Sequence, residues 1–126
     1  MNHPTIFPLD VVAMRRQLGD DDELVSDVIA LFLDDYPGRL HALKAAAEAR
    51  DAGGVRTAAH TLKGSASTFC ASRVVDAAAS LETATHREDF AVISSYVARL
   101  TAEVEQLADA LRMCRVEKRT DGAHIT

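Results

Sequence analysis

Apolar residues recur at steps of three and four along almost the whole chain, a spacing typical of amphipathic helices. A half-buried strand would instead alternate apolar and polar residues at every second position, and we identify no convincing segment of that kind. The sequence therefore predicts an all-α protein whose helices each bury one face. The clearest stripe is Ile93, Val97, Leu100, Val104, Leu107, Leu111 and Cys114.

Capping residues near the N-terminus separate a short helix from a long one. Asp10 can cap a helix over Val11 to Leu18, and Gly19 can end it. Asp20 followed by Glu23 resembles a capping box, which predicts that a second and much longer helix begins there.

Further breakers divide the rest of the chain. Pro37 lies inside the second helical stripe and predicts a kink or a break. Asp51 to Gly54 interrupts the pattern, and Ser72 and Asp89 can cap a fourth and a fifth helix. Short turns between helices with similar apolar faces imply an antiparallel four-helix bundle with a short additional N-terminal helix. The stripes expected on helices two to four are Val25, Val28, Phe32, Tyr36, Leu40, Leu43 and Ala47; Val55, Ala59, Leu62, Ala66 and Phe69; and Val74, Ala78, Leu81 and Thr85.

The length of 126 residues suits one domain. We expect a lead segment over 1–8, the bundle over 9–116 and a flexible tail over 117–126. The net charge of −5 provides no cationic field for nucleic acid or an anionic membrane surface. No apolar run approaches the roughly 20 residues that span a bilayer, and the start lacks the order of a signal peptide, so we expect a cytoplasmic protein.

The third helix presents polar residues that its packing does not require. A rotation of about 100° per residue places its flank and outer face at Arg56, His60, Lys63, Gly64 and Ser67. Lys63 can reach an anion held on the His60 imidazole. A glycine inside a helix costs about 1 kcal/mol relative to alanine, so Gly64 indicates that something approaches the backbone closely.

A neutral imidazole can act as a nucleophile, since free imidazole side chains titrate near about pH 6.5. A phosphorylated ring needs a cation and hydrogen-bond donors for its oxygens, and Lys63 with Ser65 or Ser67 could supply them. On these residues alone, a solvated surface histidine is the commoner interpretation.

The segment Ala58 to Ala66 reads Ala-Ala-His-Thr-Leu-Lys-Gly-Ser-Ala. This string resembles the signature of histidine-containing phosphotransfer (HPt) domains, the A-H-x-L-K-G-S/A pattern of phosphorelay intermediates. Those domains are similar in length, are helical bundles with the histidine on the second bundle helix, and often have a Phe-plus-Pro segment like Phe32 to Pro37. The resemblance covers roughly Leu9 to Leu111.

The resemblance implies a function in signal transduction. His60 would accept a phosphoryl group from a receiver-domain aspartate and pass it to another receiver-domain aspartate. Lys63 would offset the charge of the phosphoryl group, and Gly64 would let the receiver's loops come close. Ser65 or Ser67 would position the histidine or the phosphate, and the docking surface would include Arg56, Gly64, Ser67 and part of the second helix.

The same resemblance implies the partners and the absence of certain sites. The partners would be response-regulator receiver domains or a hybrid sensor histidine kinase, with no nucleic acid and no membrane. The receiver would bring the Mg²⁺, so we expect this chain to need no cofactor, metal or nucleotide site and to be a carrier rather than an enzyme. We expect a monomer, and Met1 with a self-contained bundle favours a free-standing protein.

Cys70 departs from the family pattern, which commonly has a glycine at that place. A cysteine there puts the local helix ending in doubt more than the chemistry. Cys70 and Cys114 have no CxxC or Cys/His spacing, so small buried hydrophobic roles are favoured over a redox role for Cys70.

Other functions stay open at this point. A non-catalytic helical-bundle scaffold or interaction module differs from a carrier only in whether His60 reacts. A histidine phosphatase would need an arginine-lined phosphate pocket, and only Arg56 lies at helical spacing from His60. A metal-bearing bundle would need Glu-x-x-His spacing on facing helices, whereas Glu82 and His86 lie four apart and are expected to form a surface pair.

Overall fold

Five α-helices make up most of the chain that the computed structural model describes, which is residues 5–6, 9–87 and 89–125, with side chains for 9–87 and 89–114. This helical content confirms the all-α prediction. The elements are β1 (Thr5–Ile6), β2 (Leu9–Asp10), α1 (Val11–Gln17), α2 (Asp22–Glu48), α3 (Ala52–Ser67), α4 (Ser72–Ala84), the 3-10 helix η1 (Thr85–Arg87) and α5 (Phe90–Ile125).

Two strands of two residues each precede the helices. The sequence showed no convincing strand, so these two were missed. β1 and β2 pair antiparallel, with Thr5 opposite Asp10 and Ile6 opposite Leu9. Two residues are too few to show the period-two pattern by which a strand is identified in a sequence. Of the expected lead segment 1–8, residues 1–4 and 7–8 lie outside the described residues.

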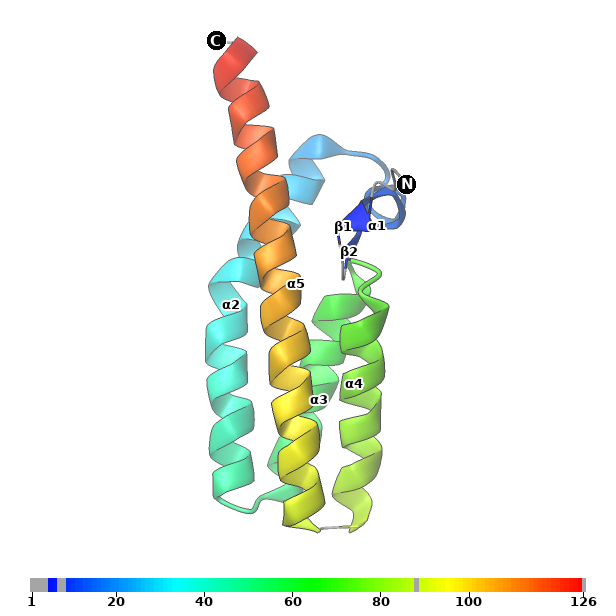
Figure 1. Ribbon diagram of the computed structural model, residues 1–126, viewed down its shortest axis with the longest axis vertical. Coiled ribbons are helices and arrows are strands. Elements are labelled where there is room, and N and C mark those ends of the chain that lie inside the picture. Colours follow the sequence, from blue (N-terminus) through cyan, green and yellow to red (C-terminus); the bar gives the residue numbers. More distant parts are fainter. Residues whose placement is uncertain (1–4, 7–8, 88, 126) are drawn as a thin grey trace.

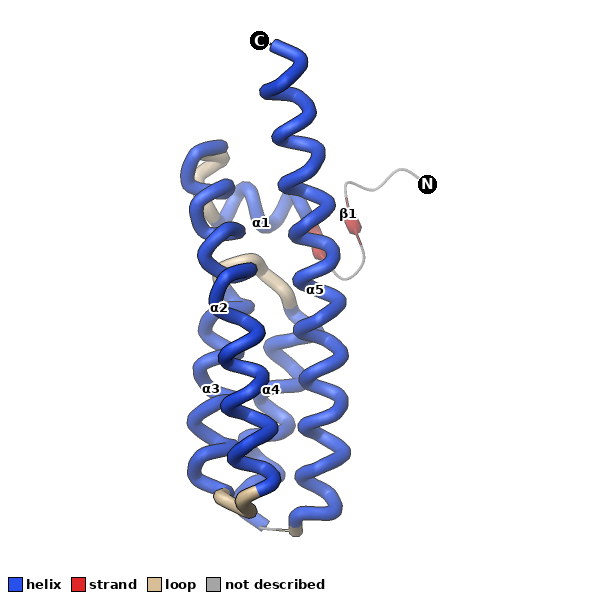
Figure 2. The backbone as a smooth tube through the Cα atoms, turned by 90° about the vertical axis from the view of Figure 1, so that its left-hand side faces the viewer, coloured by secondary structure: helices blue, strands red, loops and turns tan. Residues whose placement is uncertain are grey.

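The four long helices lie side by side along the long axis of the molecule, whereas α1 lies crosswise to them near one end (Figures 1 and 2). α2 packs against α3 and α5, and α4 packs against the same two helices. The last turns of α5 project beyond the rest of the molecule (Figure 1). This arrangement exposes one side of each long helix and buries the other.

The buried positions follow the expected stripes closely on α3, α4 and α5. Every residue expected in the α3 and α4 stripes is buried, and on α5 only Cys114 is half-buried. On α2 the stripe is less accurate, because Val28, Tyr36 and Ala47 are half-buried and Ile29 is buried instead.

Side-chain caps start most helices, with two corrections to the expected caps. Asp10, Asp51 and Asp89 accept hydrogen bonds from the first backbone N–H groups of α1, α3 and α5. The cap of α2 is Asp21 rather than Asp20, which has a φ of 55° and so belongs to the preceding turn. The cap position of α4 is Ala71, which provides no side-chain cap, and Ser72 is already helical.

The interruptions expected inside helices are weaker than the sequence suggested. α2 continues through Pro37, and Figure 1 shows its first part slanting relative to the rest, so the helix is bent but not broken. Pro37 is exposed, and its ring removes one backbone N–H from the helix without ending it. Gly53 and Gly54 belong to α3 rather than to the break before it.

The last helix extends into the segment that we expected to form a flexible tail. The backbone of α5 continues as a helix through 117–125. The flexibility expected of 117–126 stays a prediction. Within the described ranges, no helix is long and apolar enough to cross a membrane.

Candidate phosphotransfer site

His60 lies in the middle of α3 on the side that faces away from the core. Ala59 and Leu62 beside it are buried, whereas the His60 side chain is 73% exposed. A helix rotates by about 100° per residue, so a buried stripe at steps of three and four forces this position outward. The packing of α3 therefore exposes the imidazole to solvent, and the imidazole takes no part in the hydrophobic core.

A carboxylate from α4 joins His60 and Lys63. The Nδ1 atom of His60 lies 3.1 Å from Oε2 of Glu82, and the Nζ atom of Lys63 lies 2.6 Å from Oε1 of the same residue. The expected surface pair between Glu82 and His86 is wrong, because Glu82 is turned toward α3 instead. Its side chain is only 20% exposed, so the two interactions are partly shielded from water.

The pKa of Glu82 reflects this position. Burial on its own would raise the pKa of the carboxyl group, but the hydrogen bonds from Lys63 and His60 outweigh it and lower the pKa below the ordinary value. Glu82 is therefore a carboxylate at neutral pH.

The contact with Glu82 determines which ring nitrogen of His60 is available. A carboxylate can only accept hydrogen bonds, so the Nδ1 atom must carry the hydrogen that it donates to Glu82. In a neutral ring the lone pair then belongs to Nε2. The site thus consists of an exposed nucleophilic nitrogen, with an ammonium group one helical turn away.

Arg56 lies one turn before His60 and contacts the first residue of η1, directly after α4, rather than the imidazole. Its Nε atom donates to Oγ1 of Thr85 at 2.9 Å. Arg56 therefore has no direct hydrogen bond to His60 among the described residues, and its side chain is held by Thr85 instead.

The hydroxyl groups of Ser65 and Ser67 donate to the backbone of their own helix. Ser65 donates to the carbonyl of Thr61 at 3.2 Å, and Ser67 donates to the carbonyl of Gly64 at 2.8 Å. Among the described residues, neither hydroxyl bonds to His60. Their expected roles toward the histidine or the phosphate stay predictions.

Gly64 lies on the exposed surface next to His60, and nothing inside the protein requires a glycine there. A Cβ atom placed on Gly64 would meet no atom within 4 Å, and its backbone is ordinary helix. Gly54 differs, since a Cβ there would come within 2.6 Å of the capping carboxylate of Asp51. Packing within the described part of the chain therefore does not explain the glycine at position 64, whereas the close approach of a partner would.

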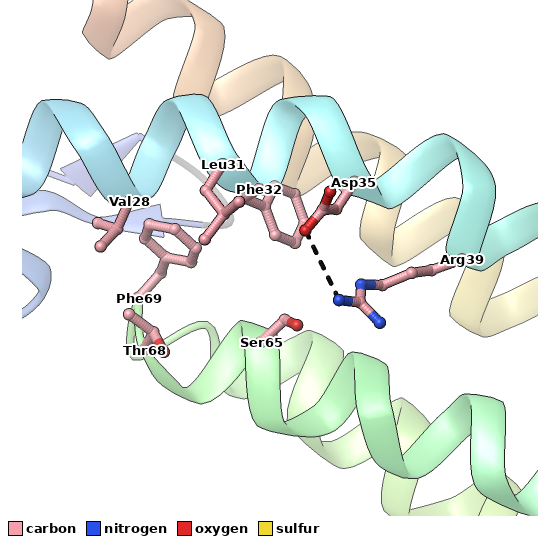
Figure 3. A pocket seen from close by; sticks show the side chains of 8 residues that line it. All are labelled: Val28, Leu31, Phe32, Asp35, Arg39, Ser65, Thr68 and Phe69. Carbon is pink, nitrogen blue, oxygen red and sulfur yellow. Dashed lines mark ion pairs between the residues drawn. The ribbon is translucent and has the colours of Figure 1, made fainter.

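A groove between α2 and α3 is lined in part by Ser65, one of the predicted site residues (Figure 3). It has a volume of 140 Å³ and a mainly apolar lining, and Leu31 at its rim is 61% exposed. Asp35 and Arg39 form an ion pair of 3.6 Å at one end. The lining residues are Val28, Leu31, Phe32, Asp35, Arg39, Ser65, Thr68 and Phe69.

Sequence reasoning missed Glu82 and Leu31 as parts of this surface. Glu82 is 22 residues from His60, and no local spacing connects two neighbouring helices at that distance. Leu31 lies outside the expected stripe of α2, but so does Ile29, which is buried, so spacing alone did not identify Leu31 as exposed. The described residues contain no group of three or more His, Cys, Asp or Glu that could hold a metal ion.

The comparison with known families agrees with the signature around His60. The model of the Hpt domain family matches residues 27–110, which is more than half of the chain and includes all the site residues. No curated protein and no solved structure shows significant similarity to the chain. With the signature histidine exposed on its helix and the family match extending over α2 to α5, this chain belongs to the Hpt domain family, whose members carry out histidine phosphotransfer in two-component signalling.

Proposed function

We propose that this chain is a phosphorelay intermediate, which accepts a phosphoryl group on His60 from one receiver-domain aspartate and passes it to another. The observation that carries the proposal is the exposed His60 ring held at Nδ1 by Glu82, which makes Nε2 the nucleophilic atom. The family match supports the type of chemistry.

The transfer step follows from this geometry. The Nε2 lone pair attacks the phosphorus of the aspartyl phosphate, the P–O bond to the aspartate breaks, and its electron pair stays on the aspartate carboxylate. The ring becomes a phosphoimidazolium that keeps its Nδ1 hydrogen, and the Glu82 carboxylate stabilises the positive charge. In the second transfer the N–P bond breaks and its electron pair returns to Nε2, and because Nδ1 has kept its hydrogen the group that leaves is a neutral imidazole.

Lys63 has two acceptors in this cycle. In the resting protein its ammonium group is paired with Glu82 at 2.6 Å. A phosphoryl group on Nε2 of His60 would bring oxygens of higher negative charge within reach of the same side chain. Lys63 then offsets the phosphoryl charge without a large movement.

The chain would act as a carrier and not as an independent enzyme. A phosphoryl group already activated on an aspartate needs no nucleotide site in the acceptor. The receiver domain would hold the Mg²⁺, and this chain would need no cofactor of its own.

The receiver would dock over Gly64 and the groove between α2 and α3. Gly64 leaves open space beside His60, and Leu31 exposes most of an apolar side chain. Docking surfaces combine such an apolar centre with a polar rim, which Asp35 and Arg39 provide here.

We infer the remaining properties from the same observations. The contacts of α2 and α4 with both α3 and α5 support an antiparallel four-helix bundle. The family and the net charge of −5 support a cytoplasmic monomer whose partners are receiver domains or a hybrid sensor histidine kinase.

The test is transfer of labelled phosphate from a phosphorylated receiver domain to this chain. We expect acid-labile, base-stable label on the wild-type protein and none on His60→Gln. His86→Gln is the matched control, because His86 is another exposed histidine and lies just after the end of α4 that carries Glu82. The His86→Gln protein should accept label normally.

Two results would contradict the proposal. Label that survives His60→Gln would move the phosphorylation site elsewhere. A folded wild-type protein that accepts no label from any of several receivers would favour a scaffold or interaction module.

A further inference from the structure

Glu82 lies in the last turn of α4, where a helix is least firmly held. α4 ends at Ala84, and the final carbonyl groups of a helix lack intrahelical partners. Helix ends fray unless other contacts hold them. The position of the carboxylate beside His60 therefore depends on what fixes this turn.

Thr85 holds the turn from inside. It is fully buried, and its hydroxyl donates to the backbone carbonyl of Glu82 at 2.6 Å. The same oxygen accepts the hydrogen bond from Nε of Arg56 at 2.9 Å. Thr85 thus joins the end of α4 to the turn of α3 that precedes His60.

Together these contacts form a closed set, meaning a continuous series that starts at α3, passes through the end of α4 and returns to α3. Arg56 connects α3 to Thr85, Thr85 connects to the backbone of Glu82, and the Glu82 side chain returns to α3 at His60 and Lys63. A closed set restricts the Glu82 carboxylate more than its own two contacts would, because both its backbone and its side chain are tied to α3.

We propose that Arg56 and Thr85 are positioning residues that hold Glu82 in place and so maintain the hydrogen on Nδ1 of His60. Hydrogen bonds weaken steeply when their length or angle is disturbed, so a small outward movement of the last α4 turn would release Nδ1. The ring could then take either tautomer, and Nε2 would no longer always carry the lone pair.

This assignment gives Arg56 a different role from the phosphate or partner contact expected from the sequence. Its consequence for transfer rests on the proposed function, but the tautomer of His60 can be measured in the resting protein without any partner. A failure of the phosphorelay proposal therefore leaves the positioning proposal testable.

The first experiment compares Thr85→Val with Thr85→Ser by nitrogen NMR of the His60 ring at a pH where the ring is neutral. Valine keeps the buried volume but removes both hydrogen bonds, and serine keeps the hydroxyl. We expect Thr85→Val to convert the Nδ1-protonated ring to a mixture of tautomers and Thr85→Ser to retain the wild-type signal. The rate of phosphoryl acceptance should fall on the order of tenfold in Thr85→Val only, because the nucleophilic nitrogen is then misplaced or protonated.

Thr101→Val is the matched control. Thr101 is also a buried threonine, but it lies on α5 and its hydroxyl has no hydrogen-bond partner in the described part of the chain. Its replacement should leave both the tautomer and the rate of acceptance unchanged.

A second variant keeps the proposal testable if Thr85→Val unfolds. Arg56 is half-buried, and Arg56→Met keeps the apolar stem while removing the donor to Thr85. It should shift the His60 tautomer in the same direction.

The Glu82→Ala background separates positioning from a general loss of structure. If Thr85 acts through Glu82, Thr85→Val should have no further effect on the ring or the rate once the carboxylate is absent. An unchanged tautomer in folded Thr85→Val and Arg56→Met, or a full effect of Thr85→Val in the Glu82→Ala background, would overturn the proposal.

Discussion

At the scale of single residues, Glu82 connects the two groups on which the proposed transfer depends, the imidazole of His60 and the ammonium group of Lys63. It accepts from the imidazole of His60 and from the ammonium of Lys63, and its own negative charge is preserved because these bonds outweigh its burial. One carboxylate therefore holds the hydrogen on Nδ1 of His60 and pairs with the nearby ammonium group, as the proposed transfer to Nε2 requires.

Glu82→Gln should reduce the stability of the protein at neutral pH but not in acid. The folded pKa of Glu82 lies below its ordinary value of 4.5, so the carboxylate stabilises the folded state above that pH. The stabilisation is lost as the pH falls through the folded pKa. Chemical denaturation at several pH values should therefore show a difference between wild type and Glu82→Gln that shrinks on acidification. A difference that stays constant with pH would contradict the lowered pKa.

Two substitutions of Gly64 should show that the stability of the protein and the rate of phosphoryl transfer respond differently at this position. Gly64→Ala should stabilise α3 by about 0.5–1 kcal/mol, because the backbone is helical and the added Cβ meets nothing. Gly64→Gln should leave the protein folded but slow transfer from a receiver, because a long side chain would occupy the approach to His60. Thermal unfolding and transfer kinetics measure the two effects. A transfer rate unchanged within error in Gly64→Gln would remove the close-approach explanation for this glycine.

At the scale of helices, the backbone at the end of α3 explains why a glycine would suit the position that Cys70 occupies. The residue has a φ of 54°, a left-handed conformation that glycine adopts without strain. The N–H of Ala71 donates to the carbonyl of Ala66, and the N–H of Cys70 donates to the carbonyl of Ser67. These bonds turn the chain sharply into α4. The helix ending that the cysteine put in doubt is therefore formed, with a side chain in a strained position.

Cys70→Gly should stabilise the protein by about 1 kcal/mol, because it relieves the left-handed strain at the end of α3. Cys70→Ala is the matched control, since alanine also removes the thiol but keeps the Cβ atom. It should not raise the stability, and it should lose the weak contact from Sγ to the carbonyl of Ala13 at 3.7 Å. Equal stability of the glycine and alanine variants in urea denaturation would show that backbone strain is not the cause.

The helices themselves could be predicted from the sequence, whereas the site could be predicted only in part. Aspartates such as Asp10 and Asp51 cap helices through local contacts, so their roles follow from sequence position. His60 is exposed as its spacing indicates, again because a helix has a regular rotation. The contact between His60 and Glu82 could not be found in this way, since it depends on how α3 and α4 pack.

At the scale of the whole molecule, the surface around His60 has two distinct sides. Toward α4, the imidazole and Lys63 meet Glu82, and Arg56 meets Thr85, so this side is polar and internally bonded. Toward α2, the groove of Figure 3 is mainly apolar and opens beside Leu31. Under the proposed function, the groups that support the chemistry would lie toward α4 and the apolar part of the docking surface toward α2, so a substitution should be able to change one without the other.

Leu31→Ala should weaken receiver binding while leaving the reactivity of His60 intact. The side chain is 61% exposed, so its removal should change the stability of the protein little. If a receiver covers it, truncation should cost about 1–2 kcal/mol of binding, or roughly tenfold in Kd. Met113→Ala, which removes another exposed apolar side chain on α5, is the control and should bind normally. Transfer measured at saturating receiver should be unaffected in both variants, because neither residue contacts the reacting atoms. Normal receiver affinity in Leu31→Ala would place the docking surface elsewhere around His60, and a loss of transfer at saturation would mean that binding and chemistry are not separated across α3.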